Sequence, residues 1–119
     1  MRLPGVIADC TAPPPVAQKA TVRPVSITLA CADDGLGVED LHWTMWTASV
    51  AVGTGWVWEN ECTPDCATGV VKSYPATVTL SGVVVTMADG VLFSELTVTY
   101  RGLGPQRQTS SRFPLPVVP

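Results

Sequence analysis

Charge is scarce in this sequence, and basic charge is both scarce and dispersed. Only 14% of the 119 residues are charged, and the formal net charge is −3. The seven basic residues form no run along the chain: Arg2, Lys19, Arg23, Lys72, Arg101, Arg107 and Arg112. Binding to a nucleic-acid backbone normally requires a basic patch or stripe that neutralises several phosphates. The sequence therefore predicts no nucleic-acid partner.

Long apolar runs are missing as well. The nearest approaches are residues 50–58 and 83–87, whereas a membrane-spanning helix needs about 18 or more consecutive apolar residues. The sequence therefore predicts no membrane span. Residues 1–5 also lack the apolar core of a secretory signal, so export would require that a signal had been removed before Met1.

The pattern that is present is alternation with a period of two, which is typical of half-buried β-strands. Two sets of residues each share one predicted face: Val25, Ile27, Leu29 and Cys31, and then Leu92, Leu96, Val98 and Tyr100. The β-branched run 83–85 predicts a strand buried on both sides. The turn residues at 88–90 then predict a hairpin.

Turn-rich joints and prolines divide the whole chain into about seven or eight short strands. We therefore expect a single β domain over residues 1–119, either an antiparallel β-sandwich or a small barrel. Residues 1–24 would supply an N-terminal strand and a proline-rich connector. Residues 112–119, with Pro114 and Pro116, would supply at most an edge segment.

The segment from Leu41 to Trp58 has two interpretations. Its apolar spacing fits a helix capped by Asp40, but its content of Trp, Thr and Val favours one long strand with a glycine bend at residues 53–55. We prefer the strand. Leu41, Trp43 and Met45 would then face inward, whereas His42, Thr44 and Trp46 would face the other side. Trp56 and Trp58 would share a face beyond the bend.

The four cysteines predict two structural disulfides, because a small exported domain gains stability from such links. We prefer Cys62 with Cys66, separated by a turn that contains Pro64, and Cys10 with Cys31. The two other pairings stay open. The Cys62/Cys66 spacing also occurs in zinc sites, but no second close pair exists and His42 is the only histidine, so we predict no metal and no cofactor.

The candidate binding residues are His42 and the tryptophans. All four tryptophans lie within residues 43–58, and an exposed indole can stack on a sugar ring or anchor a protein interface. We take Trp46, Trp56, Trp58 and His42 as the candidate site, against the alternative that most of the tryptophans fill the core. The acidic residues at 33–40 fit an ordinary turn better than a calcium loop.

A further pattern is an ordered series of segments: LACADDG at 29–35, LHWTMW at 41–46, GTG at 53–55 and NECTPDCATG at 60–69. The series resembles a group of small uncharacterised secreted proteins and lipoproteins of actinobacteria, over roughly residues 24–100. The resemblance implies export and a β-rich domain, and it carries over no catalytic residues. Cys10 lacks the residues of a lipobox, so a lipid anchor is not implied.

These observations together predict a secreted or extracytoplasmic, non-enzymatic binding domain whose partner is a protein or a cell-envelope glycan. Two alternatives remain. One is a small secreted protease inhibitor that uses the Cys62–Cys66 loop, and the other is a weak hydrolase that uses His42 and a carboxylate. No nucleophile motif accompanies His42, so we expect no enzyme.

Overall fold

The computed structural model describes residues 3–8, 20–29, 36–60, 71–86, 90–102, 104 and 107–115. The four cysteines lie outside these residues, and so do both predicted disulfides. The described chain is almost entirely β, which confirms the predicted class and strand number. Its strands are β1 Val6–Ile7, β2 Ala20–Thr21, β3 Ile27–Thr28, β4 Leu36–Trp46, β5 Ala51–Asn60, β6 Val71–Thr86, β7 Gly90–Tyr100 and β8 Ser110–Pro114.

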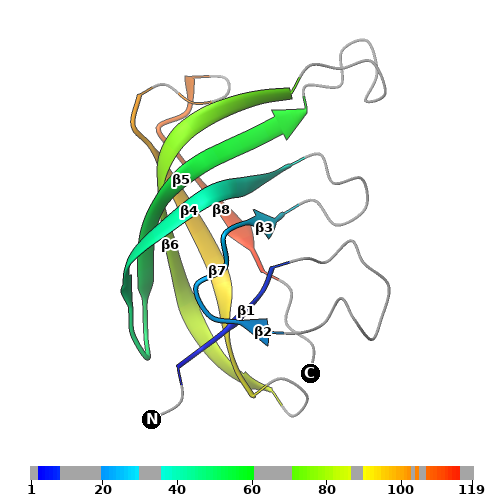
Figure 1. Ribbon diagram of the computed structural model, residues 1–119, viewed down its shortest axis with the longest axis vertical. Helices are drawn as coiled ribbons and strands as arrows, with labels where there is room; N and C mark the ends of the chain where they lie inside the picture. The colour runs from blue at the N-terminus through cyan, green and yellow to red at the C-terminus, as the bar shows by residue number, and fades with distance from the viewer. Residues whose placement is uncertain are drawn as a thin grey trace.

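The strands form two antiparallel sheets. Six of them pair in chain order from β3 to β8, and the remaining two, β1 and β2, form a small ribbon. The larger sheet curls into a half-barrel, so that its concave face encloses the core (Figure 1). The predicted hairpin at residues 88–90 is confirmed, because Thr86 of β6 pairs with Gly90 of β7. β8 is the last strand of this sheet, and residues 116–119 of the predicted edge segment lie outside the described residues.

The long strand predicted through residues 41–58 is wrong. The segment is a hairpin in which β4 and β5 are joined by a turn at Thr47–Val50. The Thr47 hydroxyl donates to the Val50 carbonyl oxygen at 2.8 Å and accepts from the Val50 amide at 3.0 Å. A side chain therefore provides the turn chemistry that glycine or proline usually signals.

Gly53 and Gly55, which were predicted to form a bend, lie inside β5, where the pairing with β6 is regular. They are required by close packing against β4. A Cβ on Gly53 would lie 2.8 Å from a ring carbon of Trp43, and a Cβ on Gly55 would lie 2.8 Å from Leu41 Cδ2. The register shifts fall instead in β4, between Glu39 and His42 and between Trp43 and Met45.

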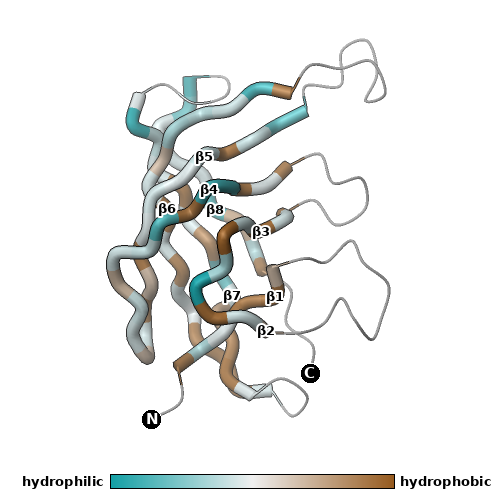
Figure 2. The backbone as a smooth tube through the Cα atoms, viewed as in Figure 1, coloured by the Kyte–Doolittle hydropathy of each residue, from teal (hydrophilic) through white to brown (hydrophobic). Residues whose placement is uncertain are grey.

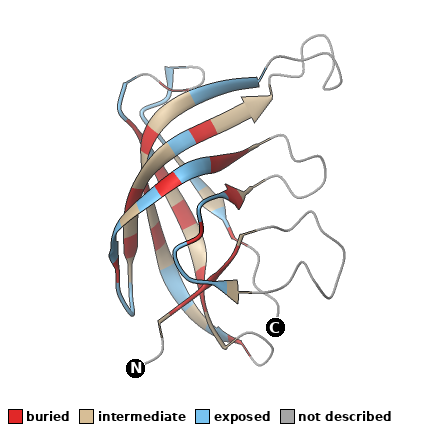
Figure 3. Ribbon diagram, viewed as in Figure 1, coloured by how far each residue is buried: buried red, intermediate tan, exposed pale blue. Residues whose placement is uncertain are grey.

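The core lies on the concave face of the sheet, and buried residues alternate with exposed ones along the strands (Figure 3). Its fully buried members include Ile27, Val38, Val57, Val78, Leu80, Phe93, Leu96 and Val98. Two of the predictions about burial are wrong. Val25 is exposed because β3 begins only at Ile27, and Val85 is 81% exposed, so the run 83–85 is not buried on both sides.

Residues 3–8 form a segment that we call the N-terminal clasp, because it joins two strands that are distant in the sheet order. Gly5 exchanges two backbone hydrogen bonds with β7, its amide donating to Val91 and its carbonyl accepting from Phe93, each at 2.9 Å. The Ala8 carbonyl accepts from Thr28 of β3 at 2.8 Å. The clasp thus bridges part of the gap left by the curled sheet, and hydrophobic segments of β1 lie near β7 (Figure 2).

No helix in the described part of the chain is long and apolar enough to cross a membrane.

Candidate functional site

The candidate site is a shallow hollow of about 80 Å³ on the convex face of β4, β5 and β6. We call it the outer-face hollow. Its lining comes from three neighbouring strands and from the residue that follows β7: Asp40, His42, Thr54, Gly55, Trp56, Pro75 and Arg101. It contains two of the four predicted site residues, His42 and Trp56.

The strand register explains why these side chains meet. His42 lies opposite Thr54, and Trp56 lies opposite Pro75. The Arg101 amide donates to the Pro75 carbonyl oxygen at 3.1 Å, which brings the end of β7 to the same place. Since Val57 is fully buried, its neighbour Trp56 must point away from the core.

Trp56 provides the aromatic surface of the hollow. Its side chain remains 43% exposed in a strand whose next residue is in the core. Pro75 lies directly across from it and adds a second apolar ring. An exposed indole on a rigid strand can contact a planar or ring-shaped partner without first losing much conformational freedom.

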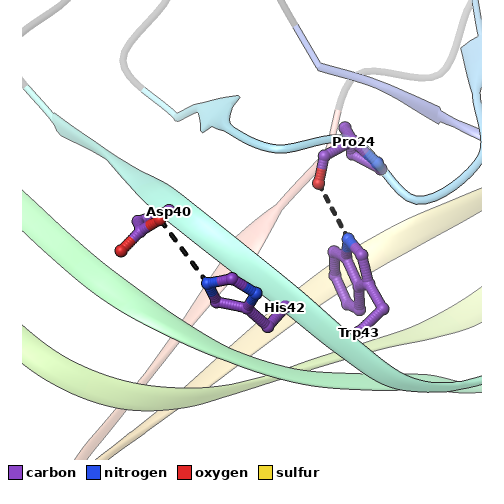
Figure 4. Close-up of polar contacts among 4 residues, drawn as sticks. All are labelled: Pro24, Asp40, His42 and Trp43. Atoms are coloured by element: carbon purple, nitrogen blue, oxygen red, sulfur yellow. Dashed lines mark hydrogen bonds and ion pairs between the residues drawn. The ribbon is translucent and has the colours of Figure 1, made fainter.

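His42 and Asp40 provide a polar rim. His42 Nε2 lies 3.6 Å from Asp40 Oδ1, and the two side chains are 76% and 68% exposed (Figure 4). Asp40 has a φ of 53°, within the irregularity of β4 between Glu39 and His42. A short polar side chain tolerates this left-handed conformation better than most residues. Because the pair is so exposed, its contribution to stability is small.

The other two predicted tryptophans do not line this hollow. Trp46 is only 7% exposed, and its Nε1 donates to the Pro4 carbonyl oxygen at 2.9 Å. Trp58 shares the outward face with Trp56, but its ring lies over Gly37, where any Cβ would overlap it. The prediction of Trp46 as a binding residue is therefore wrong, because the bulged β4 turns its indole into the core.

The same irregularity changes the neighbours of Trp46. Met45, predicted to face inward, is exposed because the register shifts between it and Trp43. Trp43 is half-buried, and its Nε1 donates to the Pro24 carbonyl oxygen at 2.8 Å (Figure 4). Trp43 and Trp46 meet edge to face, with ring centroids 4.8 Å apart. These two tryptophans hold the N-terminal region against β4.

Chemically, the outer-face hollow combines an aromatic plane with a carboxylate, an imidazole, a guanidinium and one hydroxyl. Thr54 supplies that hydroxyl. Across the described ranges, no three His, Cys, Asp or Glu side chains gather closely enough to hold a metal ion.

Sequence reasoning missed Arg101 and Pro75 as members of this site. Both reach Trp56 through strand pairing over long sequence separations, and no local pattern signals such a contact. Comparison of the chain with protein-family models, with curated proteins and with solved structures found no match.

Proposed function

We propose that this protein is a secreted, non-enzymatic binding domain that contacts its partner through the outer-face hollow. The observation that carries the proposal is the exposure of Trp56 beside Asp40, His42 and Arg101. An apolar ring surrounded by groups that donate and accept hydrogen bonds is the usual composition of a recognition surface.

The partner class that fits this surface best is a glycan of the cell envelope. A sugar ring offers an apolar face for Trp56, and its hydroxyls can donate to Asp40 and accept from Arg101 or Thr54. The convex shape of the sheet leaves room for a long polymer to lie across it. A protein partner is the alternative outcome of the test.

Support for secretion comes from the sequence. Four cysteines in a chain of 119 residues are typical of small domains that work in oxidising compartments. The resemblance to secreted actinobacterial proteins supports the same location.

The test is isothermal titration with soluble peptidoglycan and polysaccharide fragments. We expect saturable binding to at least one fragment, and we expect Trp56→Ala to weaken it at least about tenfold, or about 1.4 kcal/mol. Met45→Ala is the matched control. Met45 is also an exposed apolar residue of the β4–β5 hairpin, on β4, but it does not line the hollow.

No binding to any fragment would reject a glycan partner. An equal loss of affinity in Met45→Ala and Trp56→Ala would show that the contact is nonspecific and is not centred on the outer-face hollow.

A further inference from the structure

A larger cavity lies at the opposite side of the sheet from Trp56, inside the curl of the half-barrel. It has a volume of about 420 Å³ and is formed where β4 begins, β5 and β7 end and β8 begins, toward the top of Figure 1. We call it the mouth cavity. Its walls include Leu36, Glu59, Tyr100, Ser111 and Phe113.

Strand pairing places these side chains on the concave face. Leu36 lies opposite Glu59, and Phe113 lies opposite Leu96, which belongs to the core. Tyr100 is itself almost fully buried. The mouth cavity therefore opens from the interior of the sheet and shares no lining residue with the outer-face hollow.

The Tyr100 ring, which forms an aromatic wall of the cavity, is packed against neighbouring residues. The Tyr100 ring meets Tyr74 edge to face, with centroids 6.1 Å apart. Gly104 also lies so close to the ring that a Cβ there would overlap it. The Gly104 amide in turn donates to the Gln108 carbonyl oxygen at 2.9 Å. A wall fixed in this way can accept a ligand with little loss of side-chain entropy.

Two of the hydroxyl groups that line the cavity already have partners. Ser111 Oγ donates to Gln108 Oε1 at 3.0 Å, and Tyr100 shares a side-chain hydrogen bond with Ser111. Burial raises the pKa of the Tyr100 phenol, and the nearby negative charge of Glu59 raises that pKa further. Tyr100 therefore stays neutral at physiological pH.

Glu59 is consequently the charged group that this cavity leaves available. Arg112 also borders the cavity, but its Nε lies 2.6 Å from Glu95 Oε1, so its charge is already paired. The cross-strand neighbour of Glu59 is Lys72, which does not line the cavity. Within the described residues, no hydrogen bond or ion pair connects the Glu59 carboxylate to a donor.

We propose that the mouth cavity binds a small organic amine, with its ammonium group on Glu59 and its apolar part between Leu36, Tyr100 and Phe113. A carboxylate recognises an ammonium group through charge-assisted hydrogen bonds, and the aromatic rings favour a nearby cation. The volume of about 420 Å³ lies within the range of known small-molecule sites. This site does not depend on the outer-face hollow.

The probe pair is phenethylamine and 2-phenylethanol, which differ mainly in the ammonium group. Titration followed by amide chemical shifts, at neutral pH and low salt, measures both affinities and locates the binding. We expect saturable binding of the amine, with shifts at residues 36, 59, 100 and 111, and at least about tenfold weaker binding of the alcohol.

Glu59→Gln removes the charge with little change of shape, so we expect it to abolish the preference for the amine. Glu39→Gln is the control, because Glu39 is an exposed carboxylate on β4 that does not line the cavity. This variant should keep the preference.

Four results would overturn the proposal. They are equal affinity for the two probes, no saturable binding of either, an unchanged preference in Glu59→Gln, and an equal loss of preference in Glu39→Gln. If a variant fails to fold, the affinities of the unaltered protein for the two probes still test the proposal.

Discussion

Trp46 and Trp56 lie ten positions apart on adjacent strands of one hairpin, yet they have opposite environments. Trp46 packs edge to face on Phe93, with ring centroids 5.5 Å apart, and its indole nitrogen donates to the backbone of the N-terminal clasp. Trp56 is exposed on the convex face, and its indole nitrogen has no hydrogen bond to any other described residue. One indole is committed to the fold, and the other is available to a partner.

The two tryptophans therefore have different roles although they are the same type of residue. The role of each tryptophan depends on whether its strand directs the ring into the core and whether a backbone carbonyl accepts a hydrogen bond from the indole N–H. A buried indole whose N–H is satisfied is expensive to remove, because its removal leaves both a cavity and an unpaired carbonyl. An exposed indole has no such consequence for the fold.

The largest expected effect follows directly from this comparison. We expect Trp46→Ala to lower the free energy of unfolding by about 3–5 kcal/mol, whereas Trp56→Ala should lower it by no more than about 1 kcal/mol, the scale of a cross-strand contact. Urea denaturation followed by far-UV circular dichroism is the measurement, because tryptophan fluorescence would change with the substitution itself. Similar losses in the two variants would contradict the assignment of Trp46 to the core and Trp56 to the surface.

Trp58 offers an intermediate case, since its ring lies over Gly37 on the neighbouring strand. We expect Gly37→Ala to destabilise the protein by about 1–3 kcal/mol, because the new Cβ would overlap the ring. Adding Trp58→Ala should remove most of that extra penalty in a double-mutant cycle.

The control for this cycle is Gly102→Ala, because a Cβ at Gly102 would meet nothing within 4 Å. Its effect on stability should stay within about 0.5 kcal/mol. A Gly37→Ala penalty that persists without the Trp58 ring would point to a backbone cause instead.

The smallest expected effect concerns Tyr100 and pH. Burial raises the pKa of its phenol above the usual 10.0. Between that pH and the higher folded value, the unfolded chain has lost the proton that the folded chain retains. Stability should therefore fall as the pH rises from about 10, and it should be independent of this group below that range.

Tyr100→Phe should make this alkaline decline less steep. The measurement is a series of urea unfolding curves between neutral pH and the highest pH at which the protein stays soluble. An identical slope in the two proteins would show that Tyr100 is not responsible for the decline.

The fold class could be predicted because it depends on local patterns. Alternation marked β7, and the turn residues at 88–90 marked the hairpin between β6 and β7. The hairpin between β4 and β5 was missed because Thr47 makes its turn with a side chain, and because Gly53 and Gly55 looked like a bend. Their real role, close packing under Trp43 and Leu41, depends on a neighbouring strand that the local sequence does not reveal.

The candidate site was predicted only in part for the same reason. Trp56 and His42 were identified from residue type and alternation. Trp46 was misassigned because a register shift in β4 changes which side chains face inward. Arg101 reaches the hollow only through the pairing of β6 with β7, which no property of its own neighbourhood indicates.

The N-terminal clasp has a consequence for the order in which the protein folds. Gly5 and its hydrogen-bond partners Val91 and Phe93 are separated by more than 80 positions along the chain. Contacts between segments so far apart in the chain form slowly, because most of the intervening loop must first be closed. The N-terminal clasp can therefore dock only after β7 is in place, so we expect its docking to be a late event in folding.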